Sequence, residues 1–196
     1  RRPRLASIPE AERIHDRRNV VDAYGSLRPL TDEIGQRIME SRLKGKVAIV
    51  TGSSSGIGAA AVRMLADRGC NVVINYSRSE GPAEAVADEC RAKGVEAIAV
   101  KADVGDDADC RRLVQAAVDK WGRVDCLVNN AGTTKFVAHD DLDGLDADDF
   151  LGIYRINVVG GYQMVRAARP HLKASGDGSV VNVSSIAGVM GTGSCI

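Results

Sequence analysis

The stretch Lys46-Val-Ala-Ile-Val-Thr-Gly-Ser-Ser-Ser-Gly-Ile-Gly-Ala-Ala-Ala61 decides the fold class of this chain. Its first part, 47–50, is an apolar run that predicts a buried strand, and its last part opens a helix with three alanines. The turn between them holds three glycines and three serines. Glycines let a backbone approach a pyrophosphate, whose charge is then met by free N–H groups and the positive end of the helix. A purely structural loop leaves these glycines unexplained, so the stretch predicts a strand, a phosphate-binding turn and a helix.

The alternation of apolar strands with amphipathic helices continues along the chain. This pattern is typical of βαβ units around a parallel sheet that is buried on both faces. We therefore predict an α/β fold, a doubly wound parallel sheet with five strands present. The predicted strands are Val47–Val50, Asn71–Asn75, Val95–Val100, Val124–Val128 and Ser179–Val183, and the predicted helices are 56–69, 80–93, 106–121 and 145–173.

The composition narrows the classes of partner. The 26 basic and 26 acidic residues leave no net charge that would gather nucleic acid or an anionic membrane surface, so we expect a small-molecule partner. No apolar run approaches the roughly 20 residues that cross a bilayer, so we expect no membrane partner. The five cysteines form no Cys-x-x-Cys pair and do not combine with the three histidines at ligand spacing. We expect no metal, reduced thiols and a cytoplasmic protein.

The first 42 residues differ from the rest of the chain. Arginines, acids and prolines are mixed there, with weak apolar periodicity, and the sequence predicts a loosely structured extension over 1–42 followed by one domain over 43–196. Met39 stands just before the first strand, so one interpretation makes residues 1–38 a non-native or upstream extension. The alternative is an arginine-rich targeting or partner-binding arm, although its acids argue against a transit peptide.

Further motifs follow the glycine turn in a fixed order. The turn itself is spaced Gly-x-x-x-Gly-x-Gly, and after it come Asn129-Asn130-Ala131-Gly132, Asn157-Val158-Val159-Gly160 and Val183-Ser184-Ser185. Over residues 43–196 the sequence resembles the classical short-chain dehydrogenase/reductase family, including 3-oxoacyl-[acyl-carrier-protein] reductases and glucose dehydrogenases. The resemblance implies a dinucleotide-binding Rossmann domain in which the last strands of the family fold are missing.

The end of the second strand predicts the form of the dinucleotide. An acid there would accept the ribose hydroxyls of NAD and repel the phosphate of NADP, whereas this chain offers hydroxyl and guanidinium donors. We favour NADP(H) over NAD(H), with the alternative that Arg78 is only a solvated loop residue. Ser55 departs from the family, which carries a basic residue there. The expected cofactor contacts are Thr51, Gly52, Ser54, Ser55, Gly56, Ile57, Gly58, Asn75, Tyr76, Ser77, Arg78, Asp103, Val104, Asn130, Ala131 and Gly132.

Two of these contacts have specific roles by resemblance. Asp103 matches the family acid that accepts a hydrogen bond from the adenine amino group. A helix N-cap is its competing role, but Asp106 and Asp107 are better placed to cap the next helix. In the Asn129–Gly132 motif, small residues would let the cofactor pass the fourth strand while the amides hold neighbouring backbone.

The catalytic residues are also implied by the resemblance. Ser185 matches the serine that hydrogen-bonds the substrate oxygen, and Asn157 matches the helix asparagine that holds a water in the proton relay. Ser184 is the less favoured serine. Structural alternatives exist for both types, since serines often end strands and asparagines often kink or cap helices.

The family's Tyr-x-x-x-Lys motif is expected at or beyond position 197. None of the four tyrosines, Tyr24, Tyr76, Tyr154 and Tyr162, has a lysine four residues later. We expect Tyr154 and Tyr162 to pack in the core, the 196-residue chain to be catalytically inactive, and the sequence to be a fragment of a longer reading frame. Its fifth strand would then be an apolar sheet edge.

The leading interpretation is an NADP-dependent oxidoreductase that, as a full-length protein, transfers a hydride between nicotinamide and a ketone or secondary alcohol. The alternative is a non-catalytic dinucleotide-binding module or pseudoenzyme. Segment 133–149 is expected to border the pocket entrance, with its acidic run forming a solvated face. The resemblance implies a homo-oligomer, tetramer or dimer, that pairs the long helix.

Overall fold

Within the described residues, five parallel strands form a sheet in the order β3-β2-β1-β4-β5. The computed structural model describes residues 42–188 and residue 190, so the extension predicted for 1–42 lies outside it except for Arg42. The strands are β1 (Val47–Val50), β2 (Asn71–Tyr76), β3 (Ala97–Lys101), β4 (Cys126–Asn129) and β5 (Ser179–Asn182). This sheet confirms the predicted doubly wound α/β fold, with boundaries that differ from the predicted ones by one or two residues.

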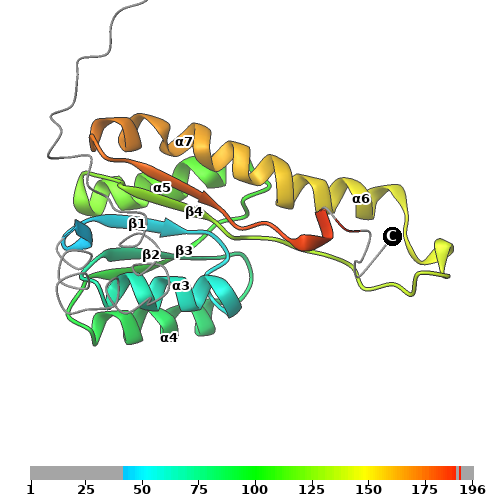
Figure 1. The fold of residues 1–196 in the computed structure, drawn as a ribbon, viewed down its shortest axis with the longest axis horizontal. Helices are drawn as coiled ribbons and strands as arrows, with labels where there is room; N and C mark the ends of the chain where they lie inside the picture. Colours follow the sequence, from blue (N-terminus) through cyan, green and yellow to red (C-terminus); the bar gives the residue numbers. More distant parts are fainter. Residues whose placement is uncertain (1–41, 189, 191–196) are drawn as a thin grey trace, which may run out of the picture. The chain divides into compact units, whose positions relative to one another are not determined.

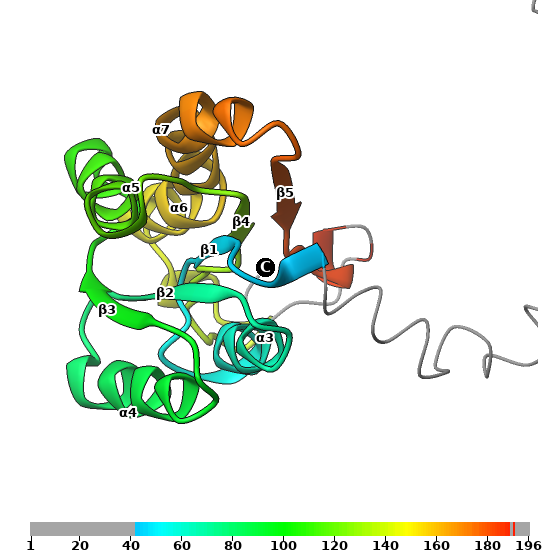
Figure 2. The same ribbon diagram turned by 90° about the vertical axis from the view of Figure 1, so that its left-hand side faces the viewer.

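Four long helices cover the two faces of the sheet (Figures 1 and 2). They are α3 (Gly56–Ala66), α4 (Glu80–Arg91), α5 (Asp107–Trp121) and α7 (Gly160–Ala174), and the shorter α6 (Ala147–Tyr154) precedes α7. Successive strand residues point to opposite faces, so β1 sends Ala48 and Val50 toward α3 and α4, and Val47 and Ile49 toward α5 and α7. All four of these side chains are fully buried. The central strand therefore anchors both halves of the core.

The helix predicted over 145–173 begins at Ala147 and contains a π-helical segment. A 3-10 turn covers Leu142–Gly144, α6 begins after a capping box in which Asp146 and Asp149 bond each other's backbone, and a π-helical segment, Arg155–Val159, separates α6 from α7. The predicted helix is therefore confirmed over 147–174, and the π segment lies inside it. An apolar period alone does not distinguish a π turn from an α turn, and π segments are frequent at functional sites.

A buried acid joins the amino ends of β1 and β4, at the opposite edge of the sheet from the glycine turn. Asp125, with a side chain 3% exposed, accepts hydrogen bonds from Val47 N at 2.9 Å and from two Arg123 nitrogens at 2.8 and 2.6 Å, and Lys46 Nζ lies 3.3 Å away. Burial alone would raise the pKa of this carboxyl. The hydrogen bonds from Arg123 and Val47 outweigh burial, so the pKa lies below its usual value.

Candidate functional site

The glycine turn and the Asn129–Gly132 motif meet at the carboxyl ends of β1 and β4, where the strand order reverses. Thr51 Oγ1 accepts hydrogen bonds from the amides of Asn130 and Ala131, both at 2.9 Å. In return, Asn130 Nδ2 donates to the carbonyls of Thr51 at 2.9 Å and Gly52 at 3.2 Å. Ligands of doubly wound sheets bind at such a switch point. The amide of Asn130 thus holds neighbouring backbone, as predicted.

Hydrogen bonds to Asn75 of β2 hold the first half of the turn. Gly52 has φ +63°, and a Cβ there would lie 2.9 Å from Ala131 Cα, so both its conformation and its surroundings require glycine. Its N–H donates to Asn75 Oδ1 at 3.0 Å. Ser53, which the sequence reasoning did not select, is fully buried and links Val50 O to the amide of Asn75. Asn75 and Ser53 therefore fix the shape of the turn.

The second half of the turn is open. A Cβ on Gly58 would lie 2.5 Å from Asn130 Nδ2 and 2.7 Å from Gly52 O, whereas one on Gly56 would meet no atom within 4 Å. Ser55 occupies the N-cap of α3 without a side-chain hydrogen bond, and no described residue accepts from the amides of Gly56, Ile57 or Gly58. Free amides at a helix start, in front of open space, fit the phosphate groups of a dinucleotide. In the same turn, Ser54 is half-buried and Ser55 is exposed.

The four expected contacts at the end of β2 divide into two pairs. Asn75 and Tyr76 are 2% and 8% exposed, so both side chains are buried. The Asn75 side-chain amide donates hydrogen bonds within the chain, including one to Ala102 O at 3.0 Å. Burial together with Glu80 raises the pKa of Tyr76. Ser77 and Arg78 are exposed. Only their side chains remain available to a 2′-phosphate.

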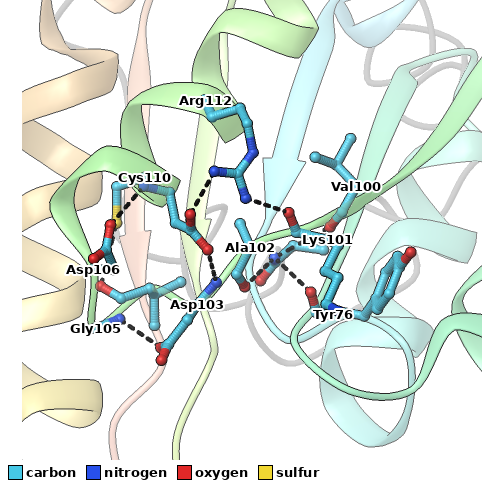
Figure 3. A network of polar contacts seen from close by, with 12 residues as sticks. Tyr76, Val100, Lys101, Ala102, Asp103, Gly105, Asp106, Cys110 and Arg112 are labelled. Atoms are coloured by element: carbon cyan, nitrogen blue, oxygen red, sulfur yellow. Dashed lines mark hydrogen bonds and ion pairs between the residues drawn. The ribbon is translucent and has the colours of Figure 1, made fainter.

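The loop after β3 is built around Asp103 (Figure 3). Asp103 Oδ1 accepts from Gly105 N at 2.8 Å, and the Asp103 amide donates to Asp109 at 2.8 Å. Arg112 holds that Asp109 carboxylate and also donates to Lys101 O at 3.0 Å. Asp106, not Asp103, is the N-cap of α5, which confirms the predicted cap. Sequence reasoning missed Asp109 and Arg112, since nothing in their helical spacing distinguishes them from solvated charges.

Val104 turns away from solvent, toward α7. It is 5% exposed, and its carbonyl accepts from Gln163 Nε2 at 3.0 Å and Cys110 Sγ at 3.2 Å. The carbonyl of Val104 thus ties the loop after β3 to the helix that follows the π segment.

Asn157 lies in the π segment and holds the backbone after β4. Its Oδ1 accepts from Thr133 N at 2.8 Å, and its Nδ2 donates to Thr133 O at 2.9 Å. A Cβ on Gly132 would lie 3.6 Å from Asn157 Oδ1, so the motif after β4 and the π segment are close neighbours. Both polar atoms of the Asn157 side chain therefore position the loop that starts at Gly132.

The two serines after β5 lie in different surroundings. Ser184 lines a cleft of ≈ 390 Å³ together with Asn157, Asn129 and Asn182. Ser185 is exposed, does not line this cleft, and accepts from Ala187 N at 3.2 Å. Asn129, 9% exposed, donates to Asn182 at 2.9 Å, and its Oδ1 has no hydrogen-bond partner in the described part of the chain.

Tyr154 and Tyr162 do not pack in the core, contrary to the prediction. They are 58% and 63% exposed. Helical spacing placed them among apolar residues, but it did not indicate which face of the helix is turned to the sheet. The acidic run that precedes them is largely exposed, and Asp149 forms an ion pair with Lys135 at 2.6 Å.

A doubly wound parallel sheet with an open glycine turn at its switch point defines a nucleotide-binding α/β protein. Comparison of the sequence with protein families makes this specific: a family model described as short chain dehydrogenase matches residues 46–195. The chain belongs to the short-chain dehydrogenase family of oxidoreductases.

Individual relatives agree with this assignment. A Streptomyces violaceoruber protein named as ketoacyl reductase 2 of the granaticin polyketide synthase is 49% identical over 150 residues, which cover 76% of this chain and 59% of that protein.

Two solved structures are also similar. A short-chain dehydrogenase/reductase from Burkholderia xenovorans has a TM-score of 0.75 and 44% identity, and the match covers 77% of this chain and 64% of that one. A short-chain dehydrogenase from Burkholderia cenocepacia J2315 in complex with NADP has a TM-score of 0.71 and 36% identity, over 78% of this chain and 60% of that one. The chain thus spans less than two thirds of the length of these relatives. In residues 42–188, no helix is both long enough and apolar enough to cross a membrane.

Proposed function

We propose that this chain binds NADP(H) as part of an oxidoreductase that transfers a hydride between the nicotinamide and a ketone or secondary alcohol. The observation that carries the proposal is the open half of the glycine turn. The amides of Gly56, Ile57 and Gly58 have no acceptor among the described residues and Gly56 borders open space, while the rest of the turn is fixed by Thr51, Asn75 and Asn130. A bound nicotinamide dinucleotide would supply the hydride.

The remaining site residues take the following proposed roles. The amides of Gly56, Ile57 and Gly58 bind the pyrophosphate, with Thr51, Gly52, Ser54 and Ser55 shaping the turn. Asp103 accepts the adenine amino group, and Val104 packs beside it. Asn130, Ala131 and Gly132 form the wall along which the dinucleotide extends. Ser185 donates a hydrogen bond to the substrate oxygen, and Asn157 positions the neighbouring loop and the relay water. A proton donor from the family's Tyr-x-x-x-Lys motif is not among residues 1–196, so we propose that this chain alone binds dinucleotide without turnover.

NADP(H) is favoured over NAD(H) by the side chains that remain available at the end of β2. Ser77 and Arg78 are exposed, and none of the hydrogen bonds or ion pairs of the described residues engages Arg78. A guanidinium pairs well with a phosphate. The acid Glu80 lies against Tyr76 at this strand end. It is the residue that would favour NAD(H) if it reached the ribose.

A non-catalytic dinucleotide-binding module is the second candidate. The observation that favours it is the use of both polar atoms of Asn157 by Thr133, which gives this asparagine a complete structural role without catalysis. Both candidates predict dinucleotide binding, and only the first predicts carbonyl reduction.

The proposal extends to the setting of the protein. We propose a cytoplasmic, homo-oligomeric protein with a small-molecule substrate and no nucleic-acid or membrane partner. Free thiols at Cys70, Cys90, Cys110 and Cys126 support a reducing compartment. Burial raises the pKa of Cys70 to about 12, which makes that thiol unreactive.

The test compares NADPH and NADH in direct binding titrations of the chain and of Arg78→Ala. We expect tighter binding of NADPH, and a loss of about tenfold for NADPH in Arg78→Ala with NADH unchanged, because only NADPH carries the charge that Arg78 meets. In the protein expressed from its complete gene, Ser185→Ala should lower kcat for ketone reduction while leaving NADPH affinity unchanged. Equal affinity of the chain for both dinucleotides would refute the NADP preference. NADPH binding without ketone reduction by the protein expressed from its complete gene would favour the non-catalytic module.

A further inference from the structure

The π segment is tied to two separate loops of the site. Asn157 holds Thr133 in the loop after β4. Two residues earlier, Arg155 Nη1 lies 3.3 Å from Asp103 Oδ2 in the loop after β3. These loops follow strands on opposite sides of β1 and β2 in the sheet order, so the π segment links parts of the site that the sheet itself keeps apart.

Close packing supports the contact to the loop after β3. A Cβ on Gly105 would lie 2.4 Å from Arg155 Nη1 and 2.7 Å from Arg155 Cζ, so a glycine is needed for the guanidinium to lie there. Gln163 adds a buried hydrogen bond to Val104 O, and a Cβ on Gly160 would lie 2.9 Å from Val104 Cγ2. Loop 103–105 and the helix from 155 to 163 therefore pack as one unit.

We propose that Arg155 is a positioning residue that couples the adenine end of the dinucleotide site to Asn157. The inference rests on the proposed function, because it uses Asp103 as the residue that meets adenine. One carboxylate oxygen of Asp103 is held by Gly105 N and the other by Arg155. A ligand that orders this carboxylate also orders the guanidinium, and through the π segment it orders the hydrogen bond between Asn157 and Thr133.

The coupling is modest and reciprocal. The Arg155 and Asp103 side chains are 49% and 40% exposed, and an ion pair of that exposure changes an equilibrium by about threefold. If adenosine binding stabilises the hydrogen bond between Thr133 and Asn157 by a given factor, then formation of that hydrogen bond increases adenosine affinity by the same factor.

The test is amide hydrogen exchange at Thr133, whose N–H donates to Asn157. The probe is 2′,5′-ADP, which carries adenosine and a 2′-phosphate but no nicotinamide, so any protection at Thr133 arises from the adenine end. We expect 2′,5′-ADP to slow this exchange in the wild-type chain, and Arg155→Met to abolish that slowing. In the free protein, Arg155→Met should exchange Thr133 about threefold faster than the wild type.

Arg166→Met is the matched control. Arg166 pairs with Asp107 at 2.5 Å with side chains 43% and 35% exposed, on the same helical run but outside the π segment. It should leave Thr133 exchange and its response to 2′,5′-ADP unchanged. Gln163→Leu, which removes the buried hydrogen bond from Gln163 to Val104 O, should reproduce the effect of Arg155→Met.

Three outcomes decide the proposal. A ligand response at Thr133 that is lost in Arg155→Met and kept in Arg166→Met supports it. An identical response in both variants overturns it. If neither NADPH nor 2′,5′-ADP binds the wild-type chain, the proposed function fails. In that case the exchange rate of free Arg155→Met still decides whether Arg155 positions Asn157.

Discussion

Each glycine of the turn has a separate physical reason. Gly52 is required by its positive φ and by Ala131, and Gly58 by the backbone of Gly52. Gly56 has φ +55° with no atom near its missing Cβ. Positive φ therefore explains glycine at 52 and 56, packing inside the chain explains it at 52 and 58, and the open space beside Gly56 leaves room for a ligand near its backbone.

Gly56→Val should abolish NADPH binding while leaving the fold intact. A valine at positive φ costs about 2 kcal/mol of stability in strain, and its methyl groups fill the space proposed for the pyrophosphate. Titration with NADPH and urea unfolding measure the two effects. The matched control is Gly94→Val, since Gly94 has φ +86° and equally open surroundings but lies beyond the end of α4. Equal loss of binding in the two variants would mean that strain, not obstruction, is responsible.

Polar groups join neighbouring strands at both their carboxyl and their amino ends, and neither strand nor helix patterns in the sequence specify these contacts. At the carboxyl edge, Thr51 and Asn130 join β1 to β4. At the amino edge, Asp125 joins the same two strands through Val47 N and Arg123. These contacts set the positions of strand ends, and the hydrogen bonds to Asp125 lower its pKa despite its burial.

Asp125→Asn should destabilise the chain by about 2 kcal/mol at neutral pH, because it removes a buried carboxylate from two cationic partners. The pKa of Asp125 is lowered in the folded state. Its contribution is therefore complete above the unfolded-state pKa near 4 and is lost as pH falls through the lower folded-state pKa. Urea unfolding from pH 7 to pH 3 should show the wild type and the variant converging at acid pH. A difference that stays constant with pH would contradict this role, and Asp88→Asn, in an exposed pair with Arg91, should change stability by less than about 0.5 kcal/mol.

At the scale of the whole molecule, one helical face carries an exposed apolar row. Phe150, Tyr154, Val158 and Tyr162 are spaced by four residues and are 53%, 58%, 50% and 63% exposed. Large apolar side chains gathered on one face are typical of protein interfaces. This row supports the proposed homo-oligomer, and two of its members, Val158 and Tyr162, also line the cleft beside Asn157.

Tyr154→Glu together with Tyr162→Glu should shift the chain toward monomer by raising the dimer dissociation constant at least about tenfold, because two charges would enter an apolar contact. Sedimentation velocity over a range of concentrations measures the shift. Met64→Glu is the control, since Met64 is 55% exposed on α3, on the other side of the sheet. A wild-type chain that stays monomeric at all concentrations would exclude this interface.

The sequence by itself determined that the fold is a doubly wound parallel sheet, where the helices lie along the chain, and where the glycine turn is. Strands buried on both faces leave a continuous apolar run, and a phosphate turn needs small residues between a strand and a helix, so both are local patterns. The N-cap at Asp106 was predictable for the same reason. Motif spacing also indicated the family that residues 46–195 match.

Only the tertiary structure decided which residues of each motif are buried and which are exposed. Asn75 and Tyr76 follow one another at the end of β2, yet both side chains belong to the scaffold, while Ser77 and Arg78 remain exposed. The π segment and the Arg155 contact to Asp103 were equally unpredictable. Burial, helix face and contacts between residues 52 positions apart depend on how elements pack against each other, and no local pattern carries that information.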